Sequence, residues 1–314
     1  MSGRLFSRAL STAAVSALLL TGCGTGNDTG AGGGGGEEAK GQITIGAFNF
    51  TESTILANVY AGALKEAGYD VTVRQLTNRE VVEPALEKGD LDVVPEYLST
   101  LTEFLNKAEN GPEAEPQASG DVDKTLEALR GLAEDRGLEV LEPSEAADQN
   151  AFAVTEKFAK ENDLETLSDL GEYSGKLVLG GPAECPTRPF CRPGLEKTYG
   201  IQFAGFKALD AGGPLTKTAL QKGDIQLGLI FSSDPGVESL KLRVLIDDKN
   251  LQNPDNVVPV LNADASDEEL VEALNGVSEA LTTDKLIDMN KKGDIDRQPP
   301  QEIAQDFLKE EGLV

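Results

Sequence analysis

Two stretches of the chain carry nearly the same sequence, and each leads through a glycine into a short apolar segment. Residues 85–92 read ALEKGDLD and residues 219–226 read ALQKGDIQ. Gly89 and Gly223 stand where a glycine commonly ends a helix. The apolar runs that follow have the length of strands in a covered parallel sheet. The repeat predicts two similar α/β lobes, although two unrelated helix-to-strand turns of this common composition would also look alike.

An aromatic residue follows each of the two predicted strands at an equivalent position. The strands are expected at residues 91–94 and 225–230, and Tyr97 and Phe231 come just after them. In open α/β sheets, ligands bind outside the carboxyl ends of the strands. The two lobes are therefore expected to form a cleft with an aromatic residue at each rim.

The first residues are typical of an exported protein. Arg4 and Arg8 precede an apolar run at residues 9–20, which is too short to span a bilayer. Residues 1–22 are thus a predicted signal peptide, and the sequence Leu-Thr-Gly before Cys23 resembles the lipobox of bacterial lipoproteins. An ordinary secretory signal, in which Cys23 has no role, is the alternative. Residues 23–41 are expected to be a lipidated cysteine and a glycine-rich tether.

Composition excludes several classes of function. The chain has 28 Lys and Arg against 54 Asp and Glu, so its net charge is −26. This charge disfavours binding to nucleic acid and to anionic lipid surfaces. The chain has no histidine, which removes Ser-His and Cys-His catalysis and the commonest metal ligand. We expect no catalytic residues, no cofactor and no metal.

Two cysteines remain if Cys23 carries a lipid. Cys185 and Cys191 lie close together in a proline-containing segment. Exported proteins fold in an oxidising compartment, so a local disulfide is expected. A redox pair or a nucleophile is the alternative, but the spacing is not Cys-X-X-Cys.

The order of predicted strands and helices suggests that the chain passes twice between the lobes. About 270 residues follow the tether, enough for two lobes with a sizeable core. Lobe 1 is predicted at residues 42–147 plus 256–314, and lobe 2 at residues 148–255. Two crossovers, near residues 146–150 and 249–257, would form a hinge.

Six segments follow one another in register, at residues 46–52, 94–97, 150–154, 181–186, 210–216 and 231–234. Together they resemble one protein family, the substrate-binding lipoproteins of osmoprotectant ABC importers. The resemblance covers nearly all of residues 42–314. It implies an α/β, two-lobed type II periplasmic-binding-protein fold with a ligand cleft between the lobes and two crossovers. It also implies a ligand of the glycine betaine, carnitine or choline type.

In that family, aromatic residues of the loops between the lobes hold the quaternary ammonium group. Aromatic faces can attract a cation that donates no hydrogen bonds. The matching positions here are Tyr97, Phe152 and Phe231, with Phe48 or Phe50 and Phe190 as further candidates. Members often carry tyrosine at the positions of Phe152 and Phe231, so this chain offers fewer hydroxyl groups. Packing in the core is the alternative role of each phenylalanine.

A betaine carboxylate would need hydrogen-bond donors, and the expected cleft loops contain them. The polar candidates are Asn49, Thr51, Thr77 and Asn150. The charged candidates are Arg79 and Arg188, each expected either to form a surface or interlobe salt bridge or to contact the ligand.

Two acidic residues have alternative interpretations. Asp210 either faces a cation or caps the turn at residues 212–213. Glu96, beside Tyr97, either assists in binding a cation or pairs with a basic residue of the permease.

The sequence favours a solute-binding component of an importer over two other functions. Its expected partners are a small quaternary ammonium ligand, an ABC permease and the membrane through a lipid anchor, with the protein itself a monomer. An extracytoplasmic enzyme acting through carboxylates would need paired carboxylates in the cleft, where aromatic and amide residues stand instead. A sensor or envelope lipoprotein of the same fold, with a different ligand and no transport role, is an alternative.

Overall fold

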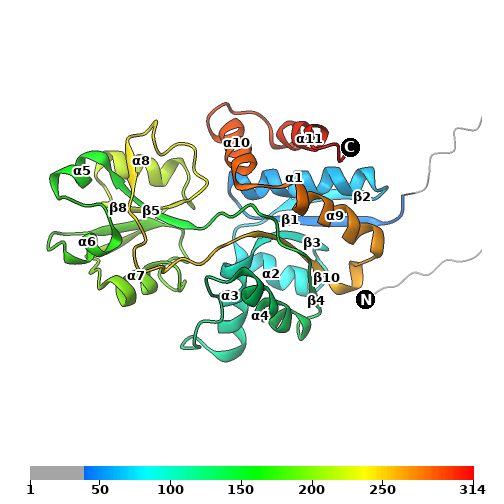
Figure 1. Ribbon diagram of the computed structural model, residues 1–314, viewed down its shortest axis with the longest axis horizontal. Helices are drawn as coiled ribbons and strands as arrows, with labels where there is room; N and C mark the ends of the chain where they lie inside the picture. The colour runs from blue at the N-terminus through cyan, green and yellow to red at the C-terminus, as the bar shows by residue number, and fades with distance from the viewer. Residues whose placement is uncertain (1–38) are drawn as a thin grey trace, which may run out of the picture. The chain divides into compact units, whose positions relative to one another are not determined.

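The computed structural model describes residues 39–314 and contains two five-stranded mixed sheets (Figure 1). The predicted signal peptide, Cys23 and most of the predicted tether lie outside the described residues. The prediction of an α/β fold with two sheets is confirmed.

The first sheet has the strand order β2-β1-β3-β10-β4. Strands β1, β2 and β3 are parallel, and β10 runs antiparallel to both of its neighbours. The strands are β1 (Gln42–Ala47), β2 (Asp70–Gln75), β3 (Val93–Tyr97), β4 (Leu138–Val140) and β10 (Val257–Asn262).

The second sheet has the order β7-β6-β8-β5-β9. Its parallel strands are β6, β7 and β8, and β5 is antiparallel to β8 and β9. The strands are β5 (Asn150–Thr155), β6 (Val178–Gly181), β7 (Gly205–Ala208), β8 (Leu227–Phe231) and β9 (Leu242–Val244). Strand by strand, this is the arrangement of the first sheet.

The sequence repeat occupies equivalent places in the two sheets. Gly89 and Gly223 both adopt positive φ, 73° and 75°, directly after the helix that leads to the central parallel strand. Tyr97 and Phe231 are the last residues of β3 and β8, so β3 ends three residues later and β8 one residue later than the predicted ends at residues 94 and 230. The repeat therefore reflects a real duplication of the architecture.

Helices cover both faces of the first sheet. Figure 1 shows α1, α9, α10 and α11 on one side of this sheet and α2, α3 and α4 on the other. Helix α1 packs against α9, α10 and α11, so the C-terminal segment returns to the first sheet. The helices are α1 (Thr51–Glu66), α2 (Arg79–Glu87), α3 (Leu98–Asn110), α4 (Val122–Glu134), α9 (Glu268–Ala280), α10 (Thr283–Asp294) and α11 (Pro300–Glu310).

Four shorter helices accompany the second sheet. They are α5 (Glu156–Glu161), α6 (Leu167–Glu172), α7 (Arg192–Tyr199) and α8 (Pro214–Lys222). Helix α8 packs against β5, β6 and β8.

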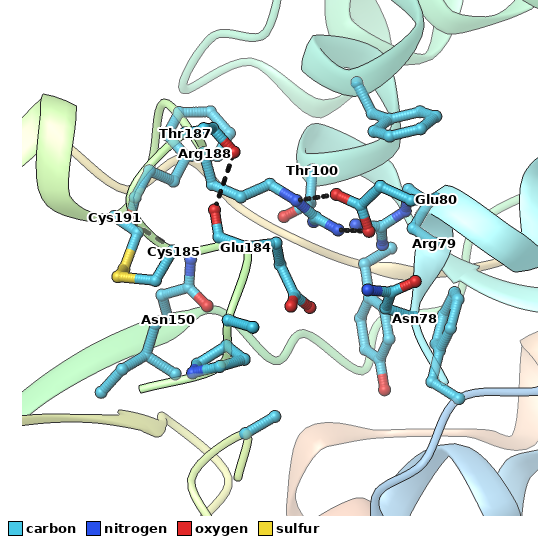
Figure 2. A pocket seen from close by; sticks show the side chains of 18 of the residues that line it. Asn78, Arg79, Glu80, Thr100, Asn150, Glu184, Cys185, Thr187, Arg188 and Cys191 are labelled. Carbon is cyan, nitrogen blue, oxygen red and sulfur yellow. Dashed lines mark hydrogen bonds and ion pairs between the residues drawn. A yellow bond between two sulfur atoms is a disulfide. The ribbon is translucent and has the colours of Figure 1, made fainter. Parts of the chain in front are cut away.

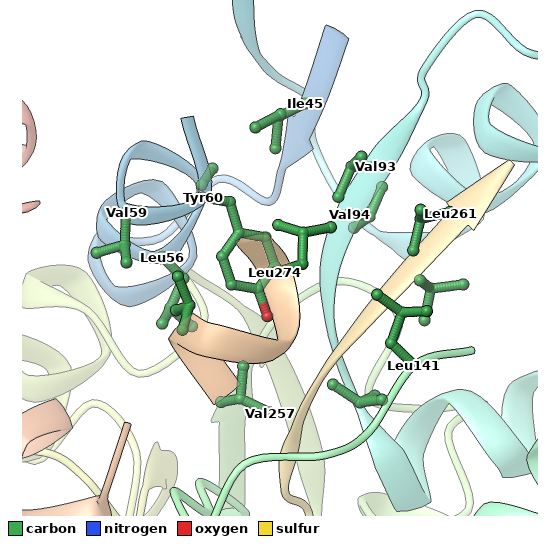
Figure 3. Close-up of a cluster of buried hydrophobic side chains, with 14 of the residues drawn as sticks. Ile45, Leu56, Val59, Tyr60, Val93, Val94, Leu141, Val257, Leu261 and Leu274 are labelled. Atoms are coloured by element: carbon green, nitrogen blue, oxygen red, sulfur yellow. The ribbon is translucent and has the colours of Figure 1, made fainter. Parts of the chain in front are cut away.

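The core of the first lobe lies between its central strands and α1. Figure 3 shows Tyr60 of α1 among aliphatic side chains from β3, β10 and α9. Ile45, Val93 and Val257 are fully buried there. A separate apolar cluster fills the second lobe and includes Phe152. Each sheet thus has its own core, as expected for two lobes.

Two crossover segments connect the sheets and pair with each other. Ala147 and Asn256 form an antiparallel bridge. The amide of Asp148 donates to the carbonyl of Asp255 at 3.0 Å, and that of Val257 donates to Ala146 at 2.9 Å. The segments predicted as crossovers thus lie side by side between the sheets. Among residues 39–314, no helix combines the length and apolar character needed to cross a bilayer.

Candidate functional site

A cavity of about 540 Å³ is lined by residues of both lobes. Much of its wall comes from loops that follow parallel strands, the place where α/β sheets bind ligands, and helix α3 also lines it. One wall is the loop after β1 together with the start of α2 and the end of β3. The facing wall is the loop after β6, the start of β5 and the end of β8.

Four rings, here called the aromatic cluster (Phe48, Phe50, Tyr97 and Phe231), lie together at this cavity. The ring of Phe50 stacks on that of Phe48 with centroids 6.0 Å apart and lies 6.2 Å from the ring of Tyr97. It also lies 5.2 Å from the ring of Phe231, which belongs to the other sheet. These distances are typical of favourable aromatic pairs. The sequence predicted either Phe48 or Phe50 at the site, and both belong to the cluster.

Phe190 also lines the cavity, and both its ring and its backbone carbonyl take part in the wall. The side chain is buried and lines the cavity. Its carbonyl accepts hydrogen bonds from the Asn150 side chain at 3.3 Å and the Gln252 side chain at 3.0 Å. The amide group of Asn150 is therefore already engaged with the protein. Asn49 and Thr77 also line the cavity.

Two predicted site residues do not line this cavity. Phe152 is 1% exposed and packs in the core of the second lobe, because it lies two residues further along β5 than Asn150. A strand rises about 3.3 Å per residue, which carries the ring away from the cavity edge. Thr51 begins α1 and donates to the Asp294 carboxylate at 2.6 Å. It lines a neighbouring cavity of about 460 Å³ that shares Phe50 and Phe231 with the first.

Arg79 and Glu96 form a buried, bidentate ion pair beneath the aromatic cluster. Arg79 Nε lies 2.8 Å from Glu96 Oε1, and Nη2 lies 2.6 Å from Oε2. Burial alone would lower the pKa of Arg79, but the Glu96 carboxylate outweighs it and the pKa is raised. The guanidinium also lies 5.2 Å from the centre of the Phe48 ring. The sequence had not paired these two residues, and the suggestion that Glu96 pairs with the permease is wrong because Arg79 occupies it.

The predicted disulfide is present and supports a second ion pair. Cys185 and Cys191 are bonded, with Cα atoms 5.2 Å apart. Between them, Arg188 reaches across to α2 and makes two hydrogen bonds of 3.0 Å to the Glu80 carboxylate (Figure 2). Its guanidinium lies 5.7 Å from the centre of the Phe104 ring. Desolvation acts to raise the pKa of Glu80, but Arg188 outweighs it and the pKa is lowered. Of its two predicted roles, Arg188 takes that of a salt bridge between the lobes.

A buried polar network that the sequence analysis missed lies beside the aromatic cluster. The Glu52 carboxylate accepts from the hydroxyl of Tyr97 at 2.6 Å, the hydroxyl of Ser233 at 2.7 Å and the amide of Asn290 at 2.5 Å. Burial raises the pKa of Glu52 despite these donors. Burial and the charge of Glu52 raise the pKa of Asp148, which accepts from the Ser233 amide at 2.8 Å.

A signal for Glu52 does exist in the sequence. Glu52 falls on the same helical stripe as Ile55, Leu56 and Val59, all of which are buried. A carboxylate on an apolar stripe at helical spacing indicates a buried polar contact.

Asp210 caps the start of α8, just beyond the turn at residues 212–213 that it was predicted to cap. Its carboxylate accepts from the amides of Leu215 and Thr216, each at 2.8 Å, and from the Thr216 hydroxyl at 2.8 Å. The carboxylate thereby satisfies free N–H groups at the start of α8. In the described residues, no group of three or more Cys, Asp and Glu side chains is arranged to hold a metal ion.

Two relatives can be aligned with this chain over most of its length. The glycine-betaine-binding protein of Pseudomonas aeruginosa is 29% identical over 285 residues, which are 87% of this chain and 88% of that protein. The carnitine transport binding protein OpuCC of Listeria monocytogenes is 28% identical over 284 residues, again 87% and 88% of the two chains.

Solved structures show the same fold. A crystal structure described as a glycine betaine/carnitine/choline ABC transporter matches with a TM-score of 0.65 at 24% identity, over 86% of this chain and 99% of that one. The apo form of YehZ from Escherichia coli matches with a TM-score of 0.59 at 25% identity, over 87% and 99%. The predicted two-lobed periplasmic-binding-protein fold is thereby confirmed.

The resemblance inferred from six motifs is confirmed over nearly the whole folded part. Residues 41–310 match the family described as the substrate binding domain of the ABC-type glycine betaine transport system. This family consists of binding components of transporters, not of enzymes. The chain belongs to the family of substrate-binding domains of ABC-type glycine betaine transport systems.

Proposed function

We propose that this protein captures a quaternary ammonium osmoprotectant, of the glycine betaine, choline or carnitine type, and delivers it to an ABC permease. The observation that carries the proposal is the aromatic cluster at the cavity. Its members Tyr97 and Phe231 end equivalent strands of the two sheets, and Phe50 contacts both rings. The names of the relatives support the same class of ligand.

Aromatic faces suit a ligand of this chemistry. A quaternary ammonium group has no N–H to donate, but its charge is attracted to the negative face of a ring. Each such contact contributes about 0.5–2 kcal/mol, more when water is excluded. Several rings at one cavity therefore provide useful affinity without a fully charged partner.

Ligand binding is proposed to close two lobes around the cavity. We assign residues 42–147 plus 256–314 to lobe 1 and residues 148–255 to lobe 2, with the paired crossovers as the hinge. Three contacts between the lobes support this closure: Phe50 with Phe231, Glu80 with Arg188, and Glu52 with Ser233. A ligand that binds better to the closed form shifts the population toward it.

Substrate-binding proteins of ABC importers are extracytoplasmic, and a lipid anchor at Cys23 is proposed to hold this one at the membrane. The acidic chain, with net charge −26, would be repelled by anionic headgroups and needs another means of attachment. The glycine-rich segment at residues 24–36 would let the folded part reach the permease.

Calorimetry with a panel of ligands tests the proposed function. The panel contains choline, glycine betaine, carnitine, an uncharged polyol and a primary-amine amino acid. We expect heat of binding from at least one quaternary ammonium compound and none from the polyol. Binding of the amino acid alone, or of no quaternary ammonium compound, would refute the proposal.

Replacement of Arg188 by alanine is expected to speed ligand release modestly. The change removes the two hydrogen bonds to Glu80 that join the disulfide loop to α2. Because Glu80 is partly exposed, the closed form should lose no more than about 1 kcal/mol of stability, which corresponds to about a fivefold faster dissociation of the ligand. Stopped-flow release measures this rate. The control Arg192→Ala breaks a pair with Glu196 within one lobe, and an equal effect in both variants would contradict a role in closure.

Replacement of Cys23 by alanine is expected to release the protein from the membrane. The exported variant should carry no acyl chains and should appear in the soluble extracytoplasmic fraction, because attachment would depend on those chains. Fractionation of cells followed by immunoblotting measures the shift. Variant protein that stays with the membrane after a high-salt wash would show that Cys23 is not the anchor.

A further inference from the structure

Both arginines that line the cavity are already neutralised by bidentate carboxylate partners. Arg79 is paired with Glu96, and Arg188 is paired with Glu80. A bidentate carboxylate occupies the planar face that an arginine offers to an acidic ligand. The two residues best suited to hold a ligand carboxylate are therefore engaged within the protein.

Glu184, by contrast, presents a carboxylate to the cavity. It stands at the start of the disulfide loop, where its carbonyl accepts from the Thr187 hydroxyl at 2.9 Å and from the amides of Thr187 and Arg188. This turn and the disulfide fix its backbone. Figure 2 shows the side chain pointing into the pocket between Asn78 and Asn150.

No side-chain hydrogen bond or ion pair within residues 39–314 engages the Glu184 carboxylate. The other carboxylates on the cavity wall are held by the protein, with Glu80 paired to Arg188 and Asp148 accepting from the Ser232 hydroxyl and the Ser233 amide. Asp255 accepts from the amide of Thr100 at 3.0 Å and from its hydroxyl, and Asp210 caps α8. Glu103 accepts from two backbone amides at 2.6 and 2.7 Å. Among these acidic groups, Glu184 is the one left to meet a ligand.

We propose that Glu184 selects the ligand by charge, so that the cavity favours a singly charged quaternary ammonium cation over a zwitterion that carries its own carboxylate. The inference rests on the proposed function and narrows its class of ligand to quaternary ammonium alcohols of the choline type. A cation gains the attraction of Glu184 in addition to the aromatic cluster. A betaine gains the same attraction at one end, but its carboxylate is repelled by Glu184 and finds both arginines occupied.

Lys107 is the one cavity-lining residue that opposes this selection. It lies in the last turn of α3, and its ammonium group makes no ion pair among the described residues. A betaine whose carboxylate reached Lys107 would escape the penalty. A Lys107→Met variant therefore belongs in the experiment.

Titration calorimetry with choline and glycine betaine tests the proposal on the parent protein and on Glu184→Gln. The parent should bind choline at least about tenfold more tightly, the size of one partly desolvated charge contact. Glu184→Gln should weaken choline binding by about tenfold and leave betaine binding unchanged or improved. Glu165→Gln, which removes an exposed charge outside the cavity of the same lobe, should leave both affinities unchanged.

Salt provides a second measurement, the dependence of choline affinity on ionic strength in the parent and in Glu184→Gln. Choline affinity of the parent should fall as ionic strength rises and should fall less for Glu184→Gln, because salt screens a partly exposed charge. Equal salt dependence in the two proteins would overturn the proposal.

The outcomes separate this inference from the proposed function. If the parent binds neither compound nor carnitine, the proposed function itself fails. If it binds both compounds equally, or if Glu184→Gln weakens both equally, the function stands and charge selection by Glu184 is wrong. Tighter binding of betaine that is lost in Lys107→Met would likewise overturn the inference and assign the carboxylate to Lys107.

Discussion

Replacement of Tyr97 by alanine is expected to weaken binding of the quaternary ammonium ligand by about 1–3 kcal/mol, or roughly 5- to 150-fold. The ring belongs to the aromatic cluster and lies 6.2 Å from that of Phe50. Its loss removes one cation–π contact and the packing that holds Phe50 in place. Isothermal titration calorimetry at constant ionic strength measures the change in affinity.

A matched variant, Tyr97→Phe, separates the ring from the hydroxyl. The hydroxyl donates to the buried Glu52 carboxylate at 2.6 Å, so Tyr97→Phe removes a donor from Glu52 but keeps the aromatic face. We expect this variant to retain most of the affinity while losing about 1–3 kcal/mol of stability, the cost of an unsatisfied buried group. Parent-like affinity in Tyr97→Ala, or an equal loss in both variants, would exclude a cation–π role for this ring.

Replacement of Arg79 by alanine is expected to lower the free energy of unfolding by about 3–5 kcal/mol. The pair with Glu96 is buried, and its removal leaves an uncompensated carboxylate between β3 and α2. Glu96 would keep its hydrogen bond from the Tyr97 amide at 3.0 Å but lose its counter-ion. Denaturant unfolding monitored by circular dichroism measures the loss, and the thermal midpoint gives an independent check.

Two further variants establish the cause of that loss. The double replacement Arg79→Leu with Glu96→Leu removes both charges and should recover much of the stability, because an apolar pair avoids the cost of desolvation. Lys207→Ala breaks the exposed pair with Asp224 and should have a much smaller effect. A loss in Arg79→Ala no larger than in Lys207→Ala would show that the buried pair does not stabilise the fold.

The sequence repeat predicted two similar α/β lobes, and the order of predicted elements and the family resemblance supplied the rest of the architecture. Helix propensity, a glycine at positive φ and an apolar strand are local properties, so the similar residues 85–92 and 219–226 favour similar helix-to-strand turns. The same repeat placed Tyr97 and Phe231 at equivalent positions in the two sheets, although both strands extend further than predicted and include these residues. Six short motifs in register then sufficed for the family.

The ion pairs at the cavity were decided by the tertiary structure alone. Arg79 and Glu96 come from different elements, as do Arg188 and Glu80, and one sequence contains no signal for which acid meets which base. The tertiary structure also decided which of the predicted aromatic residues line the cavity. Phe152 and Asn150 belong to one strand, but two residues of rise place the first in the core and the second at the cavity.

Local sequence thus predicted the two lobes, the equivalent places of Tyr97 and Phe231 and the disulfide between Cys185 and Cys191. The charge of the cavity depended on packing, because a carboxylate acts on a ligand only where the fold leaves it without a partner. Glu96 and Glu184 are the same residue type, yet one is neutralised by Arg79 and the other points into the cavity. The sequence determines that acidic residues stand near the cleft, and only the tertiary structure decides which of them a ligand meets.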